Sequence, residues 1–576
     1  MSYLMNRRFV PHDVRAAVRV RPADAAWAFA LRAGLAVAVP LVVLVAAGRT
    51  SWAGVATFGA FTALYGRDEP YRRRAVIVAA SAAGLVACVT LGTLAALTPH
   101  PEIVGVAVIA LIGAAATLLC NRYGVGPPAG LMFTFAAAVA GALPATAASV
   151  PRNAALTAGA AAVAWLIVMS GALVAPDAPR RLAVARALRA AANLHAAPSG
   201  AAGLQARQQA ALAVDKAWRA VAGRSSPSGT APPSTAGPST AGPSTAGPST
   251  AGLSAAGPSA ELRAEEVLVA HAETELSGVH GHTAEAAAEL RALAAQVKPR
   301  GPVPRLTATP AESARIAERR LAALLLRDLP APGPRTPRRP LWPAATRVAI
   351  GALIAGAAAG VLVHLTGLSH PYWAAVSAVA VLQTASLRLS LQKAIQRAGG
   401  TVLGLLIAGA AVSVPGGEWV LVAGILLAQV IAELLVIRNY GLAMLAITPL
   451  ALLVGELGHK TPPLDLIGDR LVQTVLGSLL GLAAALLVRN RAASRHLEEA
   501  LAAVEAGTET LRRDPADPML AARRLALLVA TLREAYDVAA GEPGLRPEIT
   551  ERVLTAERSA RESLATLSHR NPASAA

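Results

Sequence analysis

Two apolar blocks, residues 26–175 and 344–489, dominate this sequence, and each divides into six apolar runs. A helix of about 20 apolar residues crosses the hydrocarbon core of a bilayer. The second run of each block is short, as in transporter helices that are broken or half-buried in protein. We therefore predict an all-α polytopic membrane protein with about 12 transmembrane helices. The runs, in chain order, are 26–47, 51–65, 75–97, 103–120, 127–147 and 153–175, then 344–366, 372–387, 395–414, 418–437, 440–456 and 468–489.

The composition agrees with a bilayer as the surrounding solvent. Of 576 residues, 54% are hydrophobic and only 15% are charged, and the mean hydropathy is +0.48. The formal net charge of +18 does not indicate a nucleic-acid partner, because the arginines lie mostly in short connections between apolar runs. Cys88 and Cys120 lie inside apolar runs, so we expect no disulfide framework.

The basic connections predict the orientation of the chain. With six runs per block, all of these connections fall on the same side of the membrane as both termini. Cytoplasmic loops of membrane proteins carry an excess of Lys and Arg, so we predict that this side is the cytoplasm. The first run is too long for the apolar part of a signal peptide, so we expect an uncleaved first helix in the cell membrane. The basic connections are residues 66–74, 121–123, 178–186, 335–340, 388–397 and 489–495.

The two blocks are similar to each other in sequence. Anchor residues recur in the same order at offsets of 315 to 321 residues. An even number of helices gives both copies the same orientation, so we predict two tandem parallel six-helix repeats with a substrate site at their interface. The anchor pairs are Trp27 and Trp342, Arg32 and Arg347, Trp52 and Trp373, Tyr123 and Tyr440, Arg152 and Arg470, and Gly159 and Gly477.

The remaining sequence predicts cytoplasmic helices and one linker. Four tandem copies of the pentapeptide PSTAG (233–252) cannot build a packed core and predict a flexible linker, with modification or recognition as alternatives. The predicted organisation is a basic N-terminus (1–25), membrane repeat 1 (26–175), a cytoplasmic helical region (176–340) with a linker (224–260), membrane repeat 2 (341–490) and cytoplasmic C-terminal helices (491–576).

Ionisable and amide side chains inside a predicted span are candidates for a transport pathway, because their burial in a bilayer is costly. Gln429 and Glu433 share a helix face, and Arg438 follows five residues later. We interpret Glu433 as a proton-coupling carboxylate; the alternatives are a structural partner for a nearby Arg and an interfacial position. Gln383 lies late in its short run, and Glu456 closes the fifth run.

The stretch "SLQKAIQRAGGTVLG" (390–404) carries further candidates at the start of an apolar run. Lys393, Gln396 and Arg397 are expected to reach the headgroups and fix the topology. The alternative is a cytoplasmic vestibule that attracts a carboxylate, which Arg can bind with two parallel hydrogen bonds. Tyr440, which opens the fifth run, completes the pathway candidates.

Two further sets of residues have a simpler interpretation. The small-residue pairs Gly400 with Gly404 and Gly477 with Gly481 predict close helix packing. His271 and its neighbours in "HAETELSGVHGH" have no cysteine partner, so we expect no metal and no cofactor. The sequence also has no phosphate-binding G-x-x-x-x-G-K-[ST] motif and no G-x-S-x-G elbow, so no enzymatic activity is predicted.

The second block resembles the fusaric acid resistance / aromatic acid exporter superfamily. The resemblance rests on "HPYWAAVSAVAVLQ" (370–383), "QKAIQRAGGTVLGLLIAG" (392–409) and "DRLVQTVLGSLLGLAAALLV" (469–488). It implies efflux of aromatic or other organic acids. Our leading hypothesis is therefore a secondary, proton-coupled exporter of organic or aromatic acids, with a small organic anion and the lipid bilayer as partners. The alternatives are an organic-anion channel related to plant malate channels and a membrane scaffold that recruits cytoplasmic partners. A homo-oligomer stays open.

Overall fold

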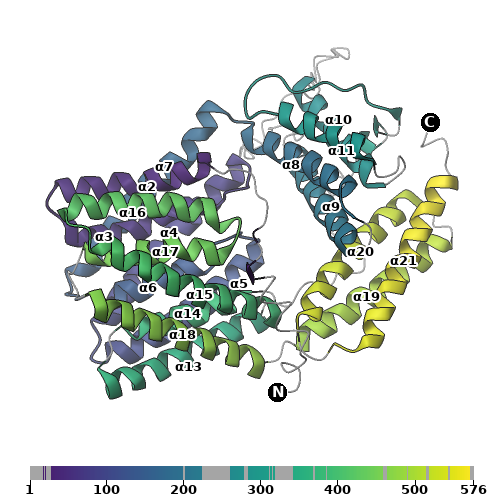
Figure 1. Ribbon diagram of the computed structural model, residues 1–576. Coiled ribbons are helices and arrows are strands. Elements are labelled where there is room, and N and C mark those ends of the chain that lie inside the picture. Colours follow the sequence, from purple (N-terminus) through teal and green to yellow (C-terminus); the bar gives the residue numbers. More distant parts are fainter. Residues whose placement is uncertain are drawn as a thin grey trace, which may run out of the picture. The chain divides into compact units, whose positions relative to one another are not determined.

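The computed structural model (Figure 1) describes the chain in segments. All regular structure within them is helical. The described residues are 17–18, 20, 27–198, 201–222, 260–277, 283–310, most of 312–319, 342–367, 370–384, 386–457, 463–488, 491–513, 518–542 and 545–570.

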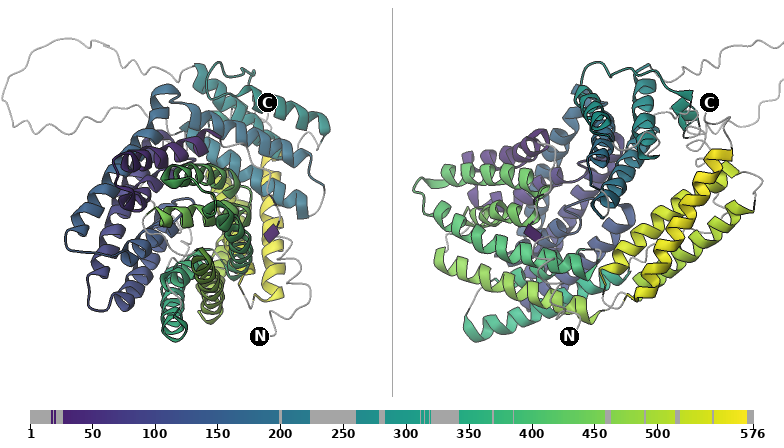
Figure 2. Two further views of the ribbon diagram at one scale, coloured as in Figure 1. Left: turned by 60° about the vertical axis from the view of Figure 1, so that its left-hand side comes forward. Right: turned by 45° about the vertical axis from the view of Figure 1, so that its right-hand side comes forward.

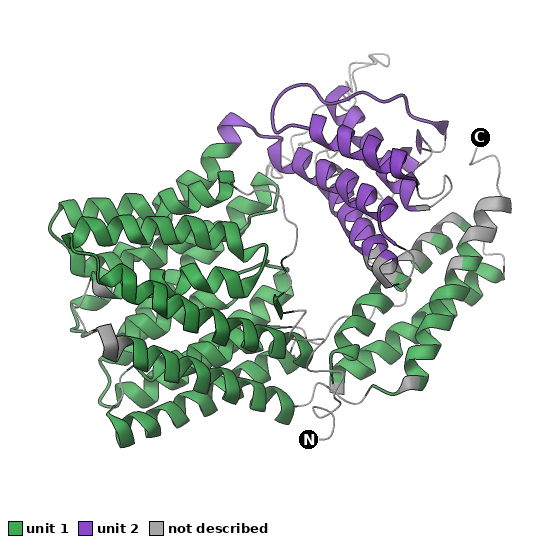
Figure 3. Cartoon of the chain, in the orientation of Figure 1, with its two compact units in different colours: residues 1–171, 334–565 green, residues 172–333, 566–576 purple. Residues whose placement is uncertain are grey.

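The chain forms two compact units, which Figure 3 colours separately. The first unit comprises residues 1–171 and 334–565, and so contains both apolar blocks and the C-terminal helices. The second comprises residues 172–333 and 566–576. The PSTAG repeats lie outside the described residues.

Each apolar block forms a series of helices that follows the predicted runs closely. The first block contains α2 (Trp27–Ala46), α3 (Thr50–Ala60) continued by the short 3-10 helix η1 (Phe61–Leu64), α4 (Tyr71–Ala96), α5 (Pro101–Tyr123), α6 (Leu131–Ala142) and α7 (Ser149–Val174). The second contains α13 (Trp342–Thr366), α14 (Tyr372–Leu382), α15 (Leu387–Val412), α16 (Gly417–Val436), α17 (Tyr440–Glu456) and α18 (Pro463–Leu487).

Eight of these described helices are long and apolar enough to cross a membrane, namely α2, α4, α5, α7, α13, α15, α16 and α18. Helices α6, α14 and α17 are apolar but shorter. At 1.5 Å per residue, the 11 residues of α14 extend only about 16 Å, roughly half of the hydrocarbon core. The predicted count of twelve transmembrane helices is therefore not confirmed.

Three of the predicted connections are helical in the structure, namely residues 121–123 at the end of α5, residues 178–186 in a helix that begins at Ala178, and residues 388–397 in α15. Residues 388–397 were expected to link two spans, but α15 begins at Leu387 and includes all of them. Leu, Gln, Lys, Ala and Arg have high helix propensity, so the segment extends the apolar helix toward its N-terminus. Arg397 consequently lies ten residues, or about 15 Å, into α15.

The two blocks pack against each other in a reciprocal pattern. Helix α5 of the first block packs against α13 of the second, and α16 of the second packs against α2 of the first. Counting all α-helices, α5 and α16 are the fourth helices of their blocks and α2 and α13 are the first, so the same positions meet in both directions. Apolar clusters accordingly combine both blocks, as where Phe58 and Ile425 share one core and Ile109 and Trp373 another. Figure 2 shows the helices of both blocks lying side by side.

Large apolar side chains also cover the outside of these helices. Leu111, Leu406 and Leu427 are each more than 60% exposed. An outward apolar surface of this kind is stable in contact with lipid and is rarely found on soluble monomers. The exposed leucines therefore agree with the membrane character that the composition predicts.

The C-terminal helices α19 (Arg491–Arg512), α20 (Pro518–Ala540) and α21 (Pro547–Arg570) belong to the first unit. A buried ion pair attaches them to the second block. Arg347 Nη1 and Nη2 donate to the two carboxylate oxygens of Glu542, each at 2.7 Å, and Arg347 Nε donates to the Val488 carbonyl at 2.6 Å. The backbone N–H of Arg388, in the first turn of α15, donates to the Gly541 carbonyl.

The second unit contains α8 (Ala178–His195), α9 (Ala201–Ala222), α10 (Ala260–Ser277) and α11 (Ala284–Gln296). Its apolar core includes Leu188, Trp218, Leu268 and Leu290. The buried Glu265 carboxylate pairs with Arg180 and contacts Arg181. Charged residues of this unit are thus used in ion pairs between its helices, here between α10 and α8.

Candidate functional site

Four helices of the second block gather polar side chains in their interior. Helices α14, α15, α17 and α18 pack through α15 with α17, α14 with α18, and α15 with α18. Residues four apart on each helix share one face, and these faces bring together the side chains that we name the polar cluster. The polar cluster comprises Trp373, Ser377, Lys393, Arg397, Tyr440 and Arg470.

Arg397 holds the centre of the polar cluster. It is only 4% exposed, and it donates from Nη1 to the Tyr440 hydroxyl at 3.0 Å and from Nη2 to the Ser377 hydroxyl at 3.1 Å. Its Nε has no hydrogen-bond partner among the described groups. The Lys393 ammonium lies 5.3 Å from the centre of the Tyr440 ring. Arg397 thus points into the protein, whereas the sequence led us to expect that its side chain reaches the headgroups.

Arg470 is the second buried guanidinium of the cluster. It is 4% exposed and lies over the ring of Trp373, which favours a cation on its face. Nε and Nη1 of Arg470 have no hydrogen-bond partner in the described part of the chain. Arg470 also lies close enough to Arg397 and Tyr440 to interact with both electrostatically.

Both arginines contact neighbouring turns of α14, because Trp373 and Ser377 are four residues apart. Two like charges this deep in an apolar bundle repel each other and have lost their hydration. The guanidinium fork matches the geometry of a carboxylate. The arrangement is therefore chemically suited to hold an anion between the two side chains.

One acidic group lies beside the cluster. Asp469 precedes Arg470 on α18 and is 7% exposed, and its Oδ2 lies 3.6 Å from His370 Nδ1. In the structure the Arg470 guanidinium faces the Trp373 ring, and a carboxylate–imidazole contact is present at Asp469.

Further buried polar atoms continue along the same helices. Gln473 is fully buried on α18, and neither its Oε1 nor its Nε2 has a partner among the described residues. Leaving a buried polar group unpaired costs about 1–3 kcal/mol, so such groups usually meet water or a ligand. Four side-chain hydroxyls on these helices are also buried without a hydrogen-bond partner among the described residues, namely those of Thr401, Thr448, Thr474 and Ser478.

The predicted packing glycines lie where these helices approach each other. A Cβ on Gly400 would overlap the backbone of α17 at Gly441, and one on Gly404 would lie 2.8 Å from the Met444 carbonyl. On α18, a Cβ on Gly477 would overlap the α14 backbone at Ala374. These close approaches allow side chains from three helices to reach the same place.

Glu433 and Gln429 lie apart from these contacts. Gln429 Nε2 donates to Glu433 Oε1 at 3.2 Å, and both side chains are buried. Glu433 is attracted electrostatically to Arg67, in the connection before α4 of the first block, and the Arg67 guanidinium lies over Phe29. Glu433 thus lies on the helix that packs against the first block.

The other predicted candidates have separate surroundings. Arg438 Nη1 donates to the Leu434 carbonyl at the end of α16. Gln383 follows α14 and lies beside Gly130 of the first block. Gln396 donates to the Ala17 carbonyl at 2.7 Å. Glu456 is the last residue of α17, and its side chain lies outside the described part.

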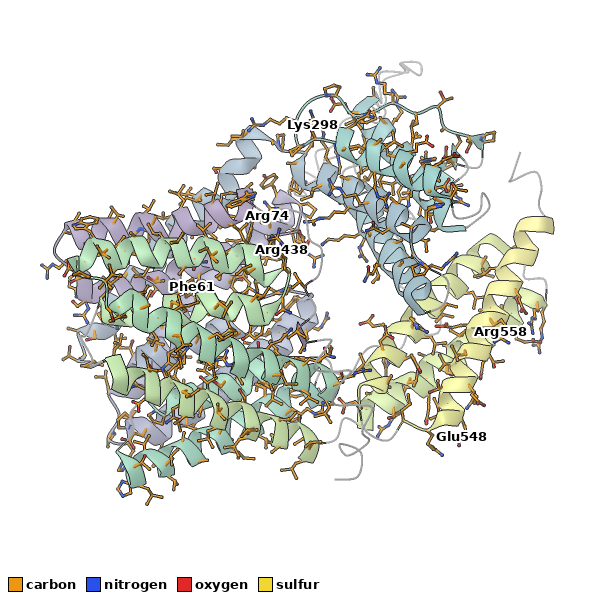
Figure 4. The ribbon with its side chains drawn as sticks, in the orientation of Figure 1. Phe61, Arg74, Lys298, Arg438, Glu548 and Arg558 are labelled. Atoms are coloured by element: carbon orange, nitrogen blue, oxygen red, sulfur yellow. The ribbon has the colours of Figure 1, made fainter. Side chains whose placement is uncertain are left out.

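Figure 4 places Arg74 and Arg438, one from each block, at the same end of the helices. Arg74 lies in the first turn of α4, and its Nε and Nη2 donate to the carbonyls of Gly66 and Arg67 in the connection before that helix. Arg438 follows α16. These two basic residues, one from each block, therefore lie on the same side of the helices.

The first block retains one feature of the cluster. Arg152 lies 5.5 Å from the ring centre of Trp52, and these are the anchor counterparts of Arg470 and Trp373. Arg152 Nη2 donates to Ser149 Oγ at 3.1 Å, so this guanidinium is served by its own helix. The repeat offset places alanine where Arg397 would be expected.

Sequence reasoning identified part of this site. Its candidates include Lys393, Arg397 and Tyr440, whereas Trp373 enters as a repeat anchor and as part of the family-like motif 370–383, and Ser377 only as part of that motif. The four-residue spacing of polar residues along α18 is a signal that could have added Gln473 and its neighbours. Within the described residues, no three His, Cys, Asp or Glu side chains gather as metal ligands would.

Comparisons with known proteins cover the site and the whole chain. Residues 357–484 match the family model of fusaric acid resistance protein-like domains, and this segment contains the entire polar cluster. The chain is 26% identical over 551 residues to the uncharacterized membrane protein YvaC of Bacillus subtilis (strain 168), which covers 93% of this chain and 84% of that protein. No solved structure matches the chain.

Proposed function

We propose, from the membership of residues 357–484 in the fusaric acid resistance protein-like family, that this multi-span membrane protein exports organic acids through its second block. The family indicates membrane transport or efflux. The observation that carries the proposal is the pair Arg397 and Arg470, both buried, both contacting α14 and both with donors that lack a partner in the described part.

An organic carboxylate fits this arrangement for two reasons. Its negative charge offsets the repulsion and lost hydration of the two guanidinium groups, and its oxygens accept the hydrogen bonds that Arg470 Nε and Nη1 offer. The Trp373 ring beside Arg470 and the Tyr440 ring beside Lys393 provide apolar surface for the rest of the molecule. This supports organic acids, aromatic ones included, over inorganic anions.

The proposal includes twelve helices in two parallel six-helix repeats, with both termini in the cytoplasm of a cell whose plasma membrane holds the protein. The reciprocal packing of α5 with α13 and α16 with α2 supports the repeat. The matching Arg–Trp contacts of the two blocks support it independently. In this arrangement the first block is mainly scaffold and the second provides the polar pathway.

Proton coupling through Glu433 is part of the leading proposal. The carboxylate is buried, keeps Gln429 as a hydrogen-bond partner and faces the first block through Arg67. A carboxylate at a block interface can couple its protonation to the relative movement of the two blocks.

An organic-anion channel is the second candidate. The observation that favours it is the separation of Glu433 from the polar cluster, whose own contacts join cations, hydroxyls and aromatic rings. Clustered cationic side chains are typical of an anion pore.

Flux in proteoliposomes distinguishes the two candidates. The full-length chain would be reconstituted, and efflux of radiolabelled 4-hydroxybenzoate and succinate would be measured under an imposed proton gradient and, separately, under an imposed membrane potential. Acceleration by the proton gradient at zero potential is the expected result. Flux that follows the potential and ignores the proton gradient would establish the channel and exclude the exporter.

A further inference from the structure

The first block contains an arginine that corresponds to Arg347 but has no acid beside it. Arg32 is the repeat anchor paired with Arg347. Arg347 donates from Nη1 and Nη2 to the two carboxylate oxygens of Glu542. Arg32 donates only from Nε, to the Ala28 carbonyl at 2.8 Å, and no carboxylate pairs with it in the described part of the chain. The same position thus holds an anion in one block and leaves Nη1 and Nη2 for one in the other.

Arg32 and Arg347 also lie at the same place relative to the last helix of their blocks. Arg347 Nε donates to the Val488 carbonyl, directly after α18. A Cβ on Gly171, near the end of α7, would lie 3.2 Å from Arg32 Nη1. An offset of 317 residues, within the range of the anchor pairs, relates Gly171 to Val488. The two arginines therefore correspond in structure as well as in sequence.

Two side chains of α4 lie beside Arg32. The Tyr71 hydroxyl lies against Gly171, as Arg32 does, and the Arg74 guanidinium lies over the Tyr71 ring, 4.6 Å from its centre. The helices that carry these residues, α2, α4 and α7, share one apolar core cluster, which fixes their spacing. We name Arg32, Tyr71 and Arg74 the interfacial site.

Exposed apolar side chains flank the interfacial site on the outside of the block. Trp27, Leu31 and Leu35 follow each other at four-residue spacing on α2 and are 56%, 58% and 52% exposed, and Val76 on α4 is 68% exposed. A surface of this kind contacts lipid chains, and tryptophan is enriched at the level of the headgroups. Arg32 directly follows Leu31, so its guanidinium borders this surface. A ligand with an anionic head and apolar tails matches both parts.

The acids of the neighbouring connection do not pair with Arg32. Glu69 pairs with Arg73 at 3.4 Å, and Asp68 interacts electrostatically with Arg74. Residues 66–74 contain four arginines and only these two acids. This end of the first block therefore keeps an excess of positive charge that attracts anionic headgroups.

We propose that the interfacial site binds the phosphate of an anionic phospholipid. The Arg32 guanidinium matches a phosphate with two parallel hydrogen bonds, as Arg347 matches the carboxylate of Glu542. The bound lipid joins α2, α4 and α7, as Glu542 joins α13 to the C-terminal helices. The site lies in the first block and contains no residue of the polar cluster, so it does not depend on the proposed transport function.

Lipid binding is tested by native mass spectrometry of the full-length chain in detergent, with phosphatidylglycerol as the titrated probe. Arg32→Gln is expected to weaken binding of the first phosphatidylglycerol by about 10- to 100-fold, the scale of a hydrogen bond to a charged group. Arg72→Gln is the matched control, because it removes the same charge from an exposed side chain in the first turn of α4, and it is expected to stay within about twofold. Equal weakening in both variants, or unchanged affinity in Arg32→Gln, would overturn the site.

A second variant keeps the test valid if Arg32→Gln does not yield folded protein. Tyr71→Phe removes the hydroxyl beside Arg32 but keeps the ring under Arg74, and it is expected to weaken binding about threefold or more. Unchanged affinity in a Tyr71→Phe protein that elutes and melts like the wild type would contradict the site.

Two further measurements on the wild type identify the ligand. Phosphatidylcholine, whose headgroup has no net charge, is expected to bind at least tenfold more weakly than phosphatidylglycerol, and equal binding of the two lipids would overturn an anionic site. Inorganic phosphate at the same concentration as the lipid is expected to leave bound phosphatidylglycerol in place. Its displacement by inorganic phosphate would assign the site to a soluble phosphate and overturn the lipid proposal.

Discussion

Arg470 lies over the ring of Trp373 in the second block as Arg152 lies over Trp52 in the first. The offset between the two blocks pairs the same four residues in the sequence. The two contacts differ in one respect, because Arg152 donates to Ser149 Oγ of its own helix and Arg470 keeps Nε and Nη1 without a partner in the described part. The Arg152 guanidinium therefore has an acceptor in its own helix, whereas the Arg470 guanidinium keeps two donors that a ligand can occupy.

The Arg–Trp pairs provide the first prediction and its own matched control. Arg470→Gln is expected to slow efflux of 4-hydroxybenzoate by about 10- to 100-fold, because a hydrogen bond to a charged group contributes about 1.5–3 kcal/mol. Arg152→Gln makes the same substitution at the counterpart and is expected to stay within about twofold of the wild type. Equal losses in the two variants would assign Arg470 a purely structural role.

The second prediction concerns the Tyr440 hydroxyl. Tyr440→Phe retains the ring that faces Lys393 but removes the oxygen that accepts from Arg397 at 3.0 Å. Arg397 then loses one of its two protein acceptors, so we expect a lower maximal flux, by about tenfold, on the energy scale of a charged hydrogen bond. The control is Tyr123→Phe, at the exposed counterpart in the first block, and measurement of substrate concentration dependence completes the test. Undiminished flux in Tyr440→Phe would contradict the role of this hydroxyl.

The sequence predicted the helices well and the site only in part, for physical reasons that particular residues show. Hydropathy is a local property of the sequence, so the positions of the helices follow it. Helix α15 begins at Leu387, before the predicted apolar run, because the preceding residues have high helix propensity and extend the helix. The sequence identifies Arg397 as a candidate cation, but its partner Ser377 belongs to another helix, and no rule of sequence spacing connects the two residues. The attraction between Glu433 and Arg67 depends on how α16 packs against the first block, which is a tertiary contact.

The third prediction separates two roles of Glu433. If the carboxylate couples transport to protons, Glu433→Gln abolishes the acceleration of efflux by a proton gradient while substrate exchange at equal pH stays within about twofold. If it is a structural partner of Arg67, both Glu433→Gln and Arg67→Gln lower the melting temperature, and the double variant costs less than the sum of the two. Loss of gradient-driven flux with a wild-type melting temperature would support coupling, and retained gradient dependence would exclude it.

The fourth prediction concerns the attachment of the C-terminal helices. Arg347 and Glu542 are 7% and 6% exposed and share two hydrogen bonds of 2.7 Å. Removing one partner of a buried pair costs about 3–5 kcal/mol because the other charge stays buried, so Arg347→Met is expected to lower the melting temperature of the purified protein by several degrees. The double variant Arg347→Met/Glu542→Leu replaces both partners. It is expected to recover much of that loss, since an apolar pair leaves no unpaired charge.

An exposed ion pair of the same C-terminal helices is the control for the attachment. Arg552 and Glu505 are 59% and 46% exposed and lie 3.1 Å apart, and pairs of this kind contribute about 0–1 kcal/mol. Arg552→Met is therefore expected to melt within about one degree of the wild type.

The attachment of the C-terminal helices also concerns the helix that carries Arg397. Gly541, next to Glu542, accepts a hydrogen bond from the N–H of Arg388 at the start of α15, so detachment of the C-terminal helices should leave the start of α15 less constrained. Arg347→Met should then change efflux of 4-hydroxybenzoate as well as stability, and an altered melting temperature with wild-type flux would confine the pair to a structural role.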